Sequence, residues 1–338
     1  MSYPMRSALI RAAAFVAMYG VSAAMAASAY RVDPVLRTKD LVPVTPIAVN
    51  EKGDSAGYAS DLSEHEQCGY RVMGGKVMKL TGSGGALIVG MNRKGDVVGT
   101  VDDLVNGLKA GMRHVVVWHA DGTREDLGEL GAPSGINAAG QVVGTRSTPD
   151  QKAEAFVYDH GRLTVLTGYD GESTYAEAIN DAGWVVGGAS IGQTTHAAMW
   201  KDGVFYDLGT LGGDNGWAYG INARGHVIGQ ADDTEGRNRG FFYDGVGMLT
   251  LQTAGGRDLL PEGINARDVV VGHDRSGVGL VWANGETRKV SHLMDGSVDD
   301  WGGLSSPSAI SDAGHLVGYG TYGKQGRLRA YIATPLIR

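Results

Sequence analysis

The sequence predicts an all-β fold, a seven-bladed β-propeller of four-stranded blades that is closed by an N-terminal strand. The main observation is a motif in which an apolar residue precedes Asn, two variable residues, Gly and a short apolar pair ending in Gly. A period in the low forties accommodates four short strands and their turns, which is the content of one blade. The motif positions are Asn50, Asn92, Asn137, Asn180, Asn222, Asn265 and Ser311, at spacings of 42, 45, 43, 42, 43 and 46 residues.

Composition and charge agree with this prediction and exclude one class of partner. The 338 residues include 54 Gly and only 9 Pro, and 20% of them are charged, as expected for short strands joined by tight turns. The net charge of -7 and the pI of 5.7 leave no basic stripe for a phosphate backbone. We therefore do not expect a nucleic-acid partner.

The first 29 residues differ from the rest of the chain. Arg6 and Arg11 precede an Ala-rich apolar run that ends in small residues, which is typical of a secretory signal peptide. We predict a signal peptide over residues 1–26, with cleavage after Ala26 or as late as Ala29. An uncleaved anchor is the alternative, although Ala is only weakly apolar. The expected product is a periplasmic or extracellular monomer with one domain, residues 30–338, and no membrane span.

The fourth repeat shows how one repeat forms one blade. Its predicted strands end at Ile179 and then cover residues 184–186, 196–200 and 204–208, with a loop over 189–195. Asn180 and Gly183 bound a tight turn, since Asn bonds nearby backbone and Gly accepts positive φ. Neighbouring sheets must approach closely where the repeats carry only small residues, at Ala48, Gly90, Gly135, Ala178, Gly220, Gly263 and Ala309.

The seventh repeat is one strand short. It supplies three predicted strands, and the chain ends before a fourth. The extended segment from Tyr30 to Arg37 has no repeat of its own, so we predict that it completes the last blade and removes exposed edges. Cys68 is the only cysteine, so no disulfide can form within the chain, and ring closure must contribute to stability.

Three stretches of the fourth and fifth repeats carry a family resemblance: residues 196–200 (HAAMW), 207–213 (DLGTLGG) and 221–225 (INARG). They resemble the HAF repeat of extracellular bacterial proteins, and the resemblance covers essentially the whole mature chain. The leading His is present only at His114 and His196; the other repeats carry Cys68, Glu154, Arg239, Val278 and Arg329 there. The resemblance implies export and a repeat architecture, and it transfers no catalytic residue.

Variable loops predict a binding face at one end of the ring. They lie between strands two and three, at 101–113, 230–238 and 319–328, and between blades, at 168–174, 212–217 and 295–303. Aromatic rings stack on sugar faces and carboxylates accept hydroxyl hydrogen bonds. Trp217 and Tyr175 could instead pack between blades, whereas Trp301 is expected to be exposed. The candidate ligand-binding residues are Tyr175, Asp214, Trp217, Tyr219, Asp299, Asp300 and Trp301.

A second variable column lies three residues before each motif Asn. It contains Glu177, Tyr219 and Glu262 in blades four to six, which could perform general acid–base chemistry at the channel if one carboxyl pKa were raised. The alternative is two acids solvated in a wet channel, and two carboxylates do not establish a glycosidase. The full column is Ile47, Val89, Ser134, Glu177, Tyr219, Glu262 and Ser308.

Clustered acids give weak candidates for a calcium site. Asp295, Asp299 and Asp300 form one group, and residues 232, 233 and 235 form another. Hard cations select clustered oxygens, but neither group has a known calcium-loop spacing, so solvated acidic loops are the favoured interpretation. We predict no cofactor.

These observations favour an exported, non-enzymatic binding scaffold that recognises a glycan or another exported protein through its variable face. One alternative is a carbohydrate-active enzyme, such as a polysaccharide lyase, which rests on analogy between folds. Another is a periplasmic inhibitor or immunity protein that blocks a toxin or hydrolase through the same face.

Overall fold

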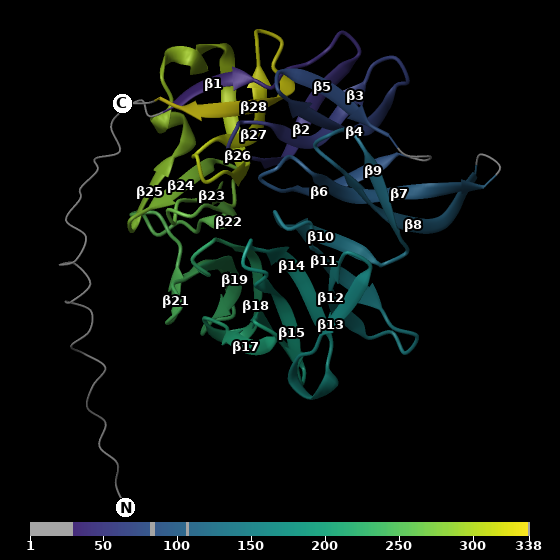
Figure 1. Cartoon of the computed structure of the whole chain (residues 1–338). Helices are drawn as coiled ribbons and strands as arrows, with labels where there is room; N and C mark the ends of the chain where they lie inside the picture. The colour runs from purple at the N-terminus through teal and green to yellow at the C-terminus, as the bar shows by residue number, and fades with distance from the viewer. Residues whose placement is uncertain (1–29, 82–84, 106–107, 337–338) are drawn as a thin grey trace, which may run out of the picture.

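The computed structural model describes residues 30–81, 85–105 and 108–336, and the predicted signal peptide lies outside these residues. The described chain forms seven four-stranded antiparallel sheets that are arranged as a ring, so the predicted seven-bladed propeller is confirmed (Figure 1). Each blade is numbered by the order of its motif in the sequence, and its first strand lies innermost in the ring.

The first three blades follow the chain in order. Blade one contains β2 (Leu41–Val49), β3 (Ser55–Asp61), β4 (Glu66–Met73) and β5 (Lys76–Leu80). Blade two contains β6 (Ala86–Met91), β7 (Val97–Val105), β8 (Leu108–Trp118) and β9 (Arg124–Gly128). Blade three contains β10 (Ala132–Ile136), β11 (Val142–Ser147), β12 (Ala153–Asp159) and β13 (Arg162–Leu166).

Blades four to six repeat this order. Blade four contains β14 (Thr174–Ile179), β15 (Val185–Ile191), β16 (Thr194–Lys201) and β17 (Val204–Gly209). Blade five contains β18 (Gly212–Ile221), β19 (Val227–Asp233), β20 (Asn238–Tyr243) and β21 (Met248–Thr250). Blade six contains β22 (Leu260–Ile264), β23 (Val270–His273), β24 (Gly279–Ala283) and β25 (Glu286–Lys289). Short 3-10 helices are η1 (Tyr169–Gly171), η2 (Val290–Leu293) and η3 (Gly296–Asp300).

Blade seven joins the two ends of the described chain. It contains β26 (Trp301–Ile310), β27 (Leu316–Tyr322) and β28 (Arg327–Pro335), and β1 (Tyr30–Pro34) pairs antiparallel with β28, with Val32 opposite Ala333. The segment predicted to close the ring is therefore the fourth strand of this blade. The core confirms the closure, because Tyr30 and Val32 are buried among residues of blades six and seven.

Each innermost strand carries a β-bulge at the same repeat position. In β14 the pairing shifts between Ala176 and Ala178, which leaves Glu177 as the extra residue. The other six strands shift at the equivalent place. The bulge brings a carbonyl of the first strand against the second strand, so a Cβ on Gly187 would lie 2.0 Å from the Tyr175 carbonyl oxygen. The Gly that follows the short apolar pair in the second strand of every repeat is thus required by the bulge.

The motif Asn residues join neighbouring blades. The Asn180 side-chain oxygen accepts hydrogen bonds from the backbone N–H groups of Ala182 and Trp184 within its own turn. Its amide nitrogen donates to the backbone carbonyl of Asn222 in the next blade at 3.0 Å. The same inter-blade bond is donated by Asn92, Asn137, Asn222 and Asn265. This explains Asn at the position, because an Asp could supply the acceptor but not the donor.

The hydrophobic core lies between blades rather than within them. One buried cluster joins Val186 and Met199 of blade four to Val227 and Phe241 of blade five, and equivalent clusters occur around the ring. At the innermost strands the small residues of neighbouring sheets face each other, since a Cβ on Gly135 would lie 3.7 Å from the Ala178 Cα, and the predicted close approach is confirmed. In the described part of the chain, no helix is long and apolar enough to cross a membrane.

The structure corrects several predicted loops. The predicted loop over 101–113 is largely strand: β7 and β8 extend through it as a hairpin that projects from the ring (Figure 1). The linker predicted over 212–217 is the beginning of β18, and the one over 295–303 contains η3 and the beginning of β26. In blade four the loop predicted over 189–195 shrinks to a turn, because β15 continues to Ile191. These hairpins extend strand pairing beyond the apolar residues that predicted the strands.

Candidate functional site

The candidate site is the wall of the central channel. The seven bulged residues come from the seven innermost strands, and they are the variable column of the sequence: Ile47, Val89, Ser134, Glu177, Tyr219, Glu262 and Ser308. We call them the bulge ring. A bulge re-aims a side chain out of the regular ladder, which allows variation there without loss of blade pairing.

The bulge ring is chemically two-sided. Blades one and two contribute the aliphatic side chains of Ile47 and Val89, whereas blades four to six contribute two carboxyl groups and a phenol. The two serines between these halves are satisfied by the protein. Ser134 donates to the Ala176 carbonyl and Ser308 to the Pro46 carbonyl, both at 2.6 Å. The polar half therefore carries the ionisable groups of the ring.

Glu177 is held by an aromatic neighbour. Trp217 Nε1 donates to Glu177 Oε1 at 3.0 Å, and the Trp217 ring lies over Gly188 and 4.9 Å from the Tyr175 ring, centroid to centroid. Burial of the carboxyl group raises the pKa of Glu177, and the Trp217 hydrogen bond opposes this only in part.

Glu262 is paired with a histidine that the sequence analysis did not select. His273 Nδ1 lies 2.8 Å from the Asp274 carbonyl oxygen, which can only accept, so Nδ1 carries a proton. His273 Nε2 lies 3.2 Å from Glu262 Oε1, and one proton between these atoms satisfies both groups. Burial raises the pKa of Glu262, and the His273 interaction opposes the shift. His273 lies on β23, the strand that pairs with β22. Only this pairing brings it to Glu262, and no sequence motif marks it.

Tyr219 lies between the two acids in the ring order and is 40% exposed. Burial of its hydroxyl raises the pKa of Tyr219, and the negative charges of Glu177 and Glu262 add to the shift. The phenol therefore stays neutral and can donate a hydrogen bond at physiological pH. Together these groups can bind a hydroxyl-rich or cationic group, and a protonated carboxyl could act as a general acid.

The structure brings together only part of the predicted ligand-binding set. Tyr175, Trp217 and Tyr219 cluster with Glu177 at the channel, but Tyr175 and Trp217 are half-buried against each other, which is the packing alternative. Asp214 is exposed at the beginning of β18.

The prediction that Trp301 is exposed is wrong. Trp301 is only 8% exposed and packs against the rings of Tyr322 and Tyr331. Trp301 belongs to the buried cluster of the closing blade. The acidic residues just before it in sequence wrongly indicated exposure. Asp299 and Asp300 are exposed in η3, which packs beside β1 at the outer strand of blade seven. They do not join the channel residues.

The calcium candidates have other partners. Asp295 caps η3 by accepting from the Ser297 backbone N–H at 2.9 Å. Asp233 forms ion pairs with Arg237 and Arg239 at 2.9 and 3.1 Å, and Glu235 pairs with Arg237 at 2.6 Å. Among the described residues, no group of three His, Cys, Asp or Glu side chains is placed to hold a metal ion.

The structure also explains the His of the HAF-like repeats. His196 Nδ1 lies 2.9 Å from Asp207, and Asp207 accepts from the Gly209 backbone N–H at 2.8 Å. His114 and Asp126 form the same pair in blade two at 3.0 Å. The His and the Asp-Leu-Gly segment are thus two halves of one contact between the third and fourth strands of a blade.

Comparison with known proteins shows the fold alone. The propeller domain of the trilobed protease of Pyrococcus furiosus is similar over 89% of this chain and 99% of its own, with a TM-score of 0.60 and 9% identity. An acylaminoacyl peptidase of Pyrococcus horikoshii matches with a TM-score of 0.54 and 13% identity over 89% of this chain. A puromycin-hydrolysing peptidase of Mycobacterium tuberculosis matches with 0.53 and 14% over 88%.

This chain spans about half the length of those two peptidases, 52% and 53% respectively. No family model and no curated protein matches the sequence. The resemblance to the HAF repeat therefore stays a prediction, and function must be argued from the site.

Proposed function

We propose that this protein is an exported, non-enzymatic binding scaffold that recognises another exported protein through the face where the innermost strands begin, here called the upper face. The observation that carries the proposal is the bulge ring. A uniform framework of Asn turns and inter-blade bonds presents its most variable side chains in the channel, and the polar half of that ring is partly exposed.

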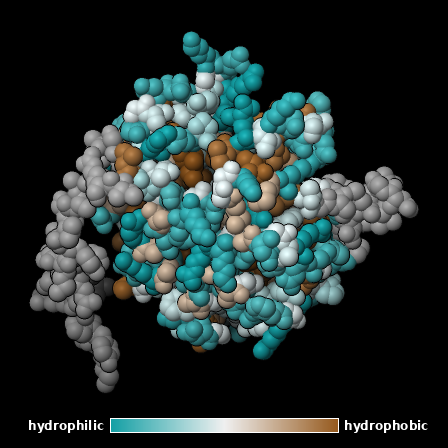
Figure 2. Space-filling view, turned by 45° about the horizontal axis from the view of Figure 1, so that its top comes forward, coloured by the Kyte–Doolittle hydropathy of each residue, from teal (hydrophilic) through white to brown (hydrophobic). Residues whose placement is uncertain are grey.

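Of the two ligand classes predicted from sequence, the geometry favours a protein. A glycan site needs exposed aromatic faces for stacking. Trp301 is buried and Trp217 is half-buried, so the two tryptophans that supported a sugar-binding surface do not provide one. What remains in the bulge ring is a mixed set of acids, phenol and aliphatic groups. The face shown in Figure 2 is mostly hydrophilic, with hydrophobic residues gathered in its upper half. Protein interfaces have this character, and a periplasmic inhibitor or immunity protein would use it in the same way.

A retention experiment tests the proposal. Mature protein, the double variant Tyr219→Ala/Glu262→Gln and the control Lys52→Ala are immobilised and exposed to the exported fraction of the source organism. Lys52 is exposed in an Asn turn at the opposite end of the ring. A partner retained by the wild type and the control, and lost from the double variant, supports the proposal. Equal retention by all three contradicts it.

The raised pKa values of Glu177 and Glu262 favour one second candidate, a carbohydrate-active enzyme such as a polysaccharide lyase. Electrophoresis of the mature protein through gels that contain different polysaccharides distinguishes these functions. Binding to a polysaccharide retards migration, and an enzyme consumes the polymer. We expect free migration in every gel. Polymer loss that disappears in Glu262→Gln would establish the enzyme instead.

A further inference from the structure

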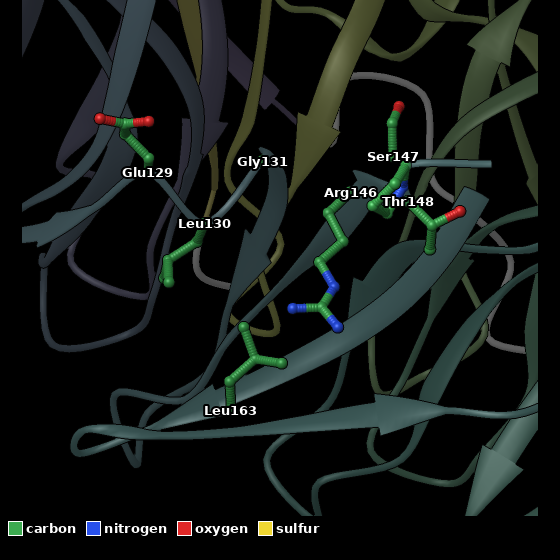
Figure 3. Close-up of a pocket in the computed structure, with 8 residues that line it drawn as sticks. Glu129, Leu130, Gly131, Arg146, Ser147, Thr148 and Leu163 are labelled. Atoms are coloured by element: carbon green, nitrogen blue, oxygen red, sulfur yellow. The ribbon is translucent and has the colours of Figure 1, made fainter. Parts of the chain in front are cut away.

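Two adjacent cavities lie between blades two and three on the upper face. One, of about 540 Å³, is bounded by Leu87, Val89 and Pro133 and reaches the bulge ring at Val89. The other, of about 460 Å³, lies between Leu130, Arg146 and Leu163 (Figure 3). The linker from Glu129 to Gly131 lines both and separates them. Each volume falls in the range of small-ligand pockets, about 300–1,000 Å³.

The repeat shows why the larger cavity is empty of protein side chains. In blade five, Trp217 lies five residues before the motif Asn and covers Gly188, which lies eight residues after the motif Asn of blade four. The equivalent residues between blades two and three are Ala132 and Thr100. Both are small, so nothing fills the space that the Trp217 ring fills two blades further on.

Every other junction has at least one larger side chain at these two positions. Each pair gives first the residue eight positions after one motif Asn (or Ser311) and then the residue five positions before the next. The pairs are Tyr58 and Leu87, Thr145 and Tyr175, Gly188 and Trp217, Gln230 and Leu260, His273 and Ser306, and Tyr319 and Thr45. The opening beside Ala132 is therefore a departure from a rule that the rest of the ring obeys.

One side-chain hydroxyl lines this cavity and is available to a ligand. Thr100 lines it and is only 6% exposed, and its hydroxyl makes no hydrogen bond to any residue that the structure describes. A hydroxyl can both donate and accept a hydrogen bond, so Thr100 can pair with a polar group of a ligand that enters the cavity. A ligand with a polar tip would satisfy it.

We propose that the cavity beside Ala132 binds an aromatic side chain with a polar tip, the phenol of a tyrosine on the partner protein. The size follows from the Trp217 ring at the equivalent junction, the aliphatic walls suit a ring, and the Thr100 hydroxyl bonds the phenol oxygen. Leu87, Val89 and Pro133 form the apolar part of the lining, and Arg113 and Glu129 add charged groups to it. The inference rests on the proposed function only in naming a protein as the source of the ring.

The second cavity receives the neighbouring part of the same partner segment. Leu130 and Leu163 offer an apolar floor, and Arg146 donates through Nε and Nη2 to Glu154 Oε2, at 3.1 and 2.9 Å. Its guanidinium group is directed towards Leu163, and Glu129 lies on the other side of the cavity (Figure 3). The Arg146–Glu154 pair and Glu129 thus supply the polar groups on the sides of this second cavity.

The test uses N-acetyl-tyrosinamide as the probe, titrated into the mature protein and followed by NMR. Saturable shifts at Thr100, Leu87 and Val89 are expected, with a dissociation constant on the order of 1 mM for a ligand of this size. Ala132→Trp fills the cavity from within, as Trp217 does in blade five, and should abolish the shifts. Thermal unfolding of the Ala132→Trp variant is the control for an intact ring.

Thr100→Val provides a second readout that does not depend on filling the cavity. It should weaken N-acetyl-tyrosinamide about fivefold and leave the matched probe N-acetyl-phenylalaninamide unchanged, because only the phenol loses a hydrogen bond. Tyr219→Ala should leave probe binding intact, so a failure of the proposed function and a failure of this site give different results. Absence of saturable shifts, or equal binding by wild type and folded Ala132→Trp, overturns the inference.

Discussion

At the scale of single residues, the repeat is governed by steric and hydrogen-bonding demands that only certain side chains meet. The Gly at the third position of β15 admits the carbonyl of the bulged strand, with 2.0 Å between a hypothetical Cβ of Gly187 and the Tyr175 carbonyl oxygen. The bulge in turn frees Glu177 to vary. The sequence showed the variable column and the glycines, but the bulge that connects them was visible only in the pairing register.

Gly187→Ala tests this connection. The added methyl group must displace the Tyr175 backbone, so we expect the free energy of unfolding to fall by about 1–3 kcal/mol, as for other overpacked sites. Urea denaturation measures the change. The matched control is Gly303→Ala in β26, where a Cβ meets no atom within 4 Å, and it should be nearly neutral. Equal losses in both variants would show that the bulge does not require glycine.

Glu177→Gln tests the burial of the channel acids. The pKa of Glu177 is raised in the folded state above its ordinary value of about 4.3, so its contribution to stability is fully present below that pH and is lost as the pH rises through the folded pKa. Gln keeps an acceptor for Trp217 and does not ionise. The variant should therefore be more stable than the wild type at pH 7, and the two should converge below pH 4. A difference in melting temperature that is independent of pH would refute this.

At the scale of the blade, the Asn turn accounts for the strength of the sequence signal. One side chain closes its own turn through its oxygen and reaches the next blade through its nitrogen. Blade boundaries and strand order were therefore predictable. Strand lengths were not, because hairpins such as β7–β8 extend beyond the positions that the repeats share. The burial of Trp301 was not predictable either. Its acidic neighbours in sequence lie in η3, whereas its own ring packs against Tyr322.

Asn180→Ser isolates the inter-blade bond. Ser occupies the same place in blade seven, where the Ser311 hydroxyl accepts from the His315 backbone N–H, so the turn tolerates it. The variant keeps an acceptor and loses the donor to the Asn222 carbonyl, and we expect it to cost about 1 kcal/mol. Thermal unfolding of Asn180→Ser beside Ala182→Ser, an exchange in the same turn, gives the measurement. An unchanged melting temperature would mean that the bond between blades four and five contributes nothing.

At the scale of the whole molecule, closure of the ring by β1 joins the beginning of the described chain to its end. Val32 is 2% exposed and pairs opposite Ala333. A chain that begins at Val35 should expose the edge of β28, melt at a lower temperature and aggregate. Size-exclusion chromatography and thermal unfolding against the mature chain measure both effects. A stable monomer with unchanged melting would show that the closing strand is dispensable.

The molecule as a whole also shows where sequence reasoning ends. The ring, its blade number and its closing strand followed from the period, whereas His273 and the cavity beside Ala132 depend on which residues adjacent blades bring together. No sequence motif marks either of them. Both become visible when equivalent positions of neighbouring repeats are compared in space, because the missing ring at Ala132 has meaning only against Trp217.

The central claim is that the channel wall formed by the bulge ring contacts an exported partner. Site-specific photo-crosslinking tests it most directly, with p-benzoyl-phenylalanine in place of Tyr219 in one protein and in place of Lys52 at the opposite end in another. We predict one defined adduct from position 219, suppressed by Glu262→Gln in the same chain, and none from position 52. No adduct at position 219, or the same adducts from both positions, would contradict the account.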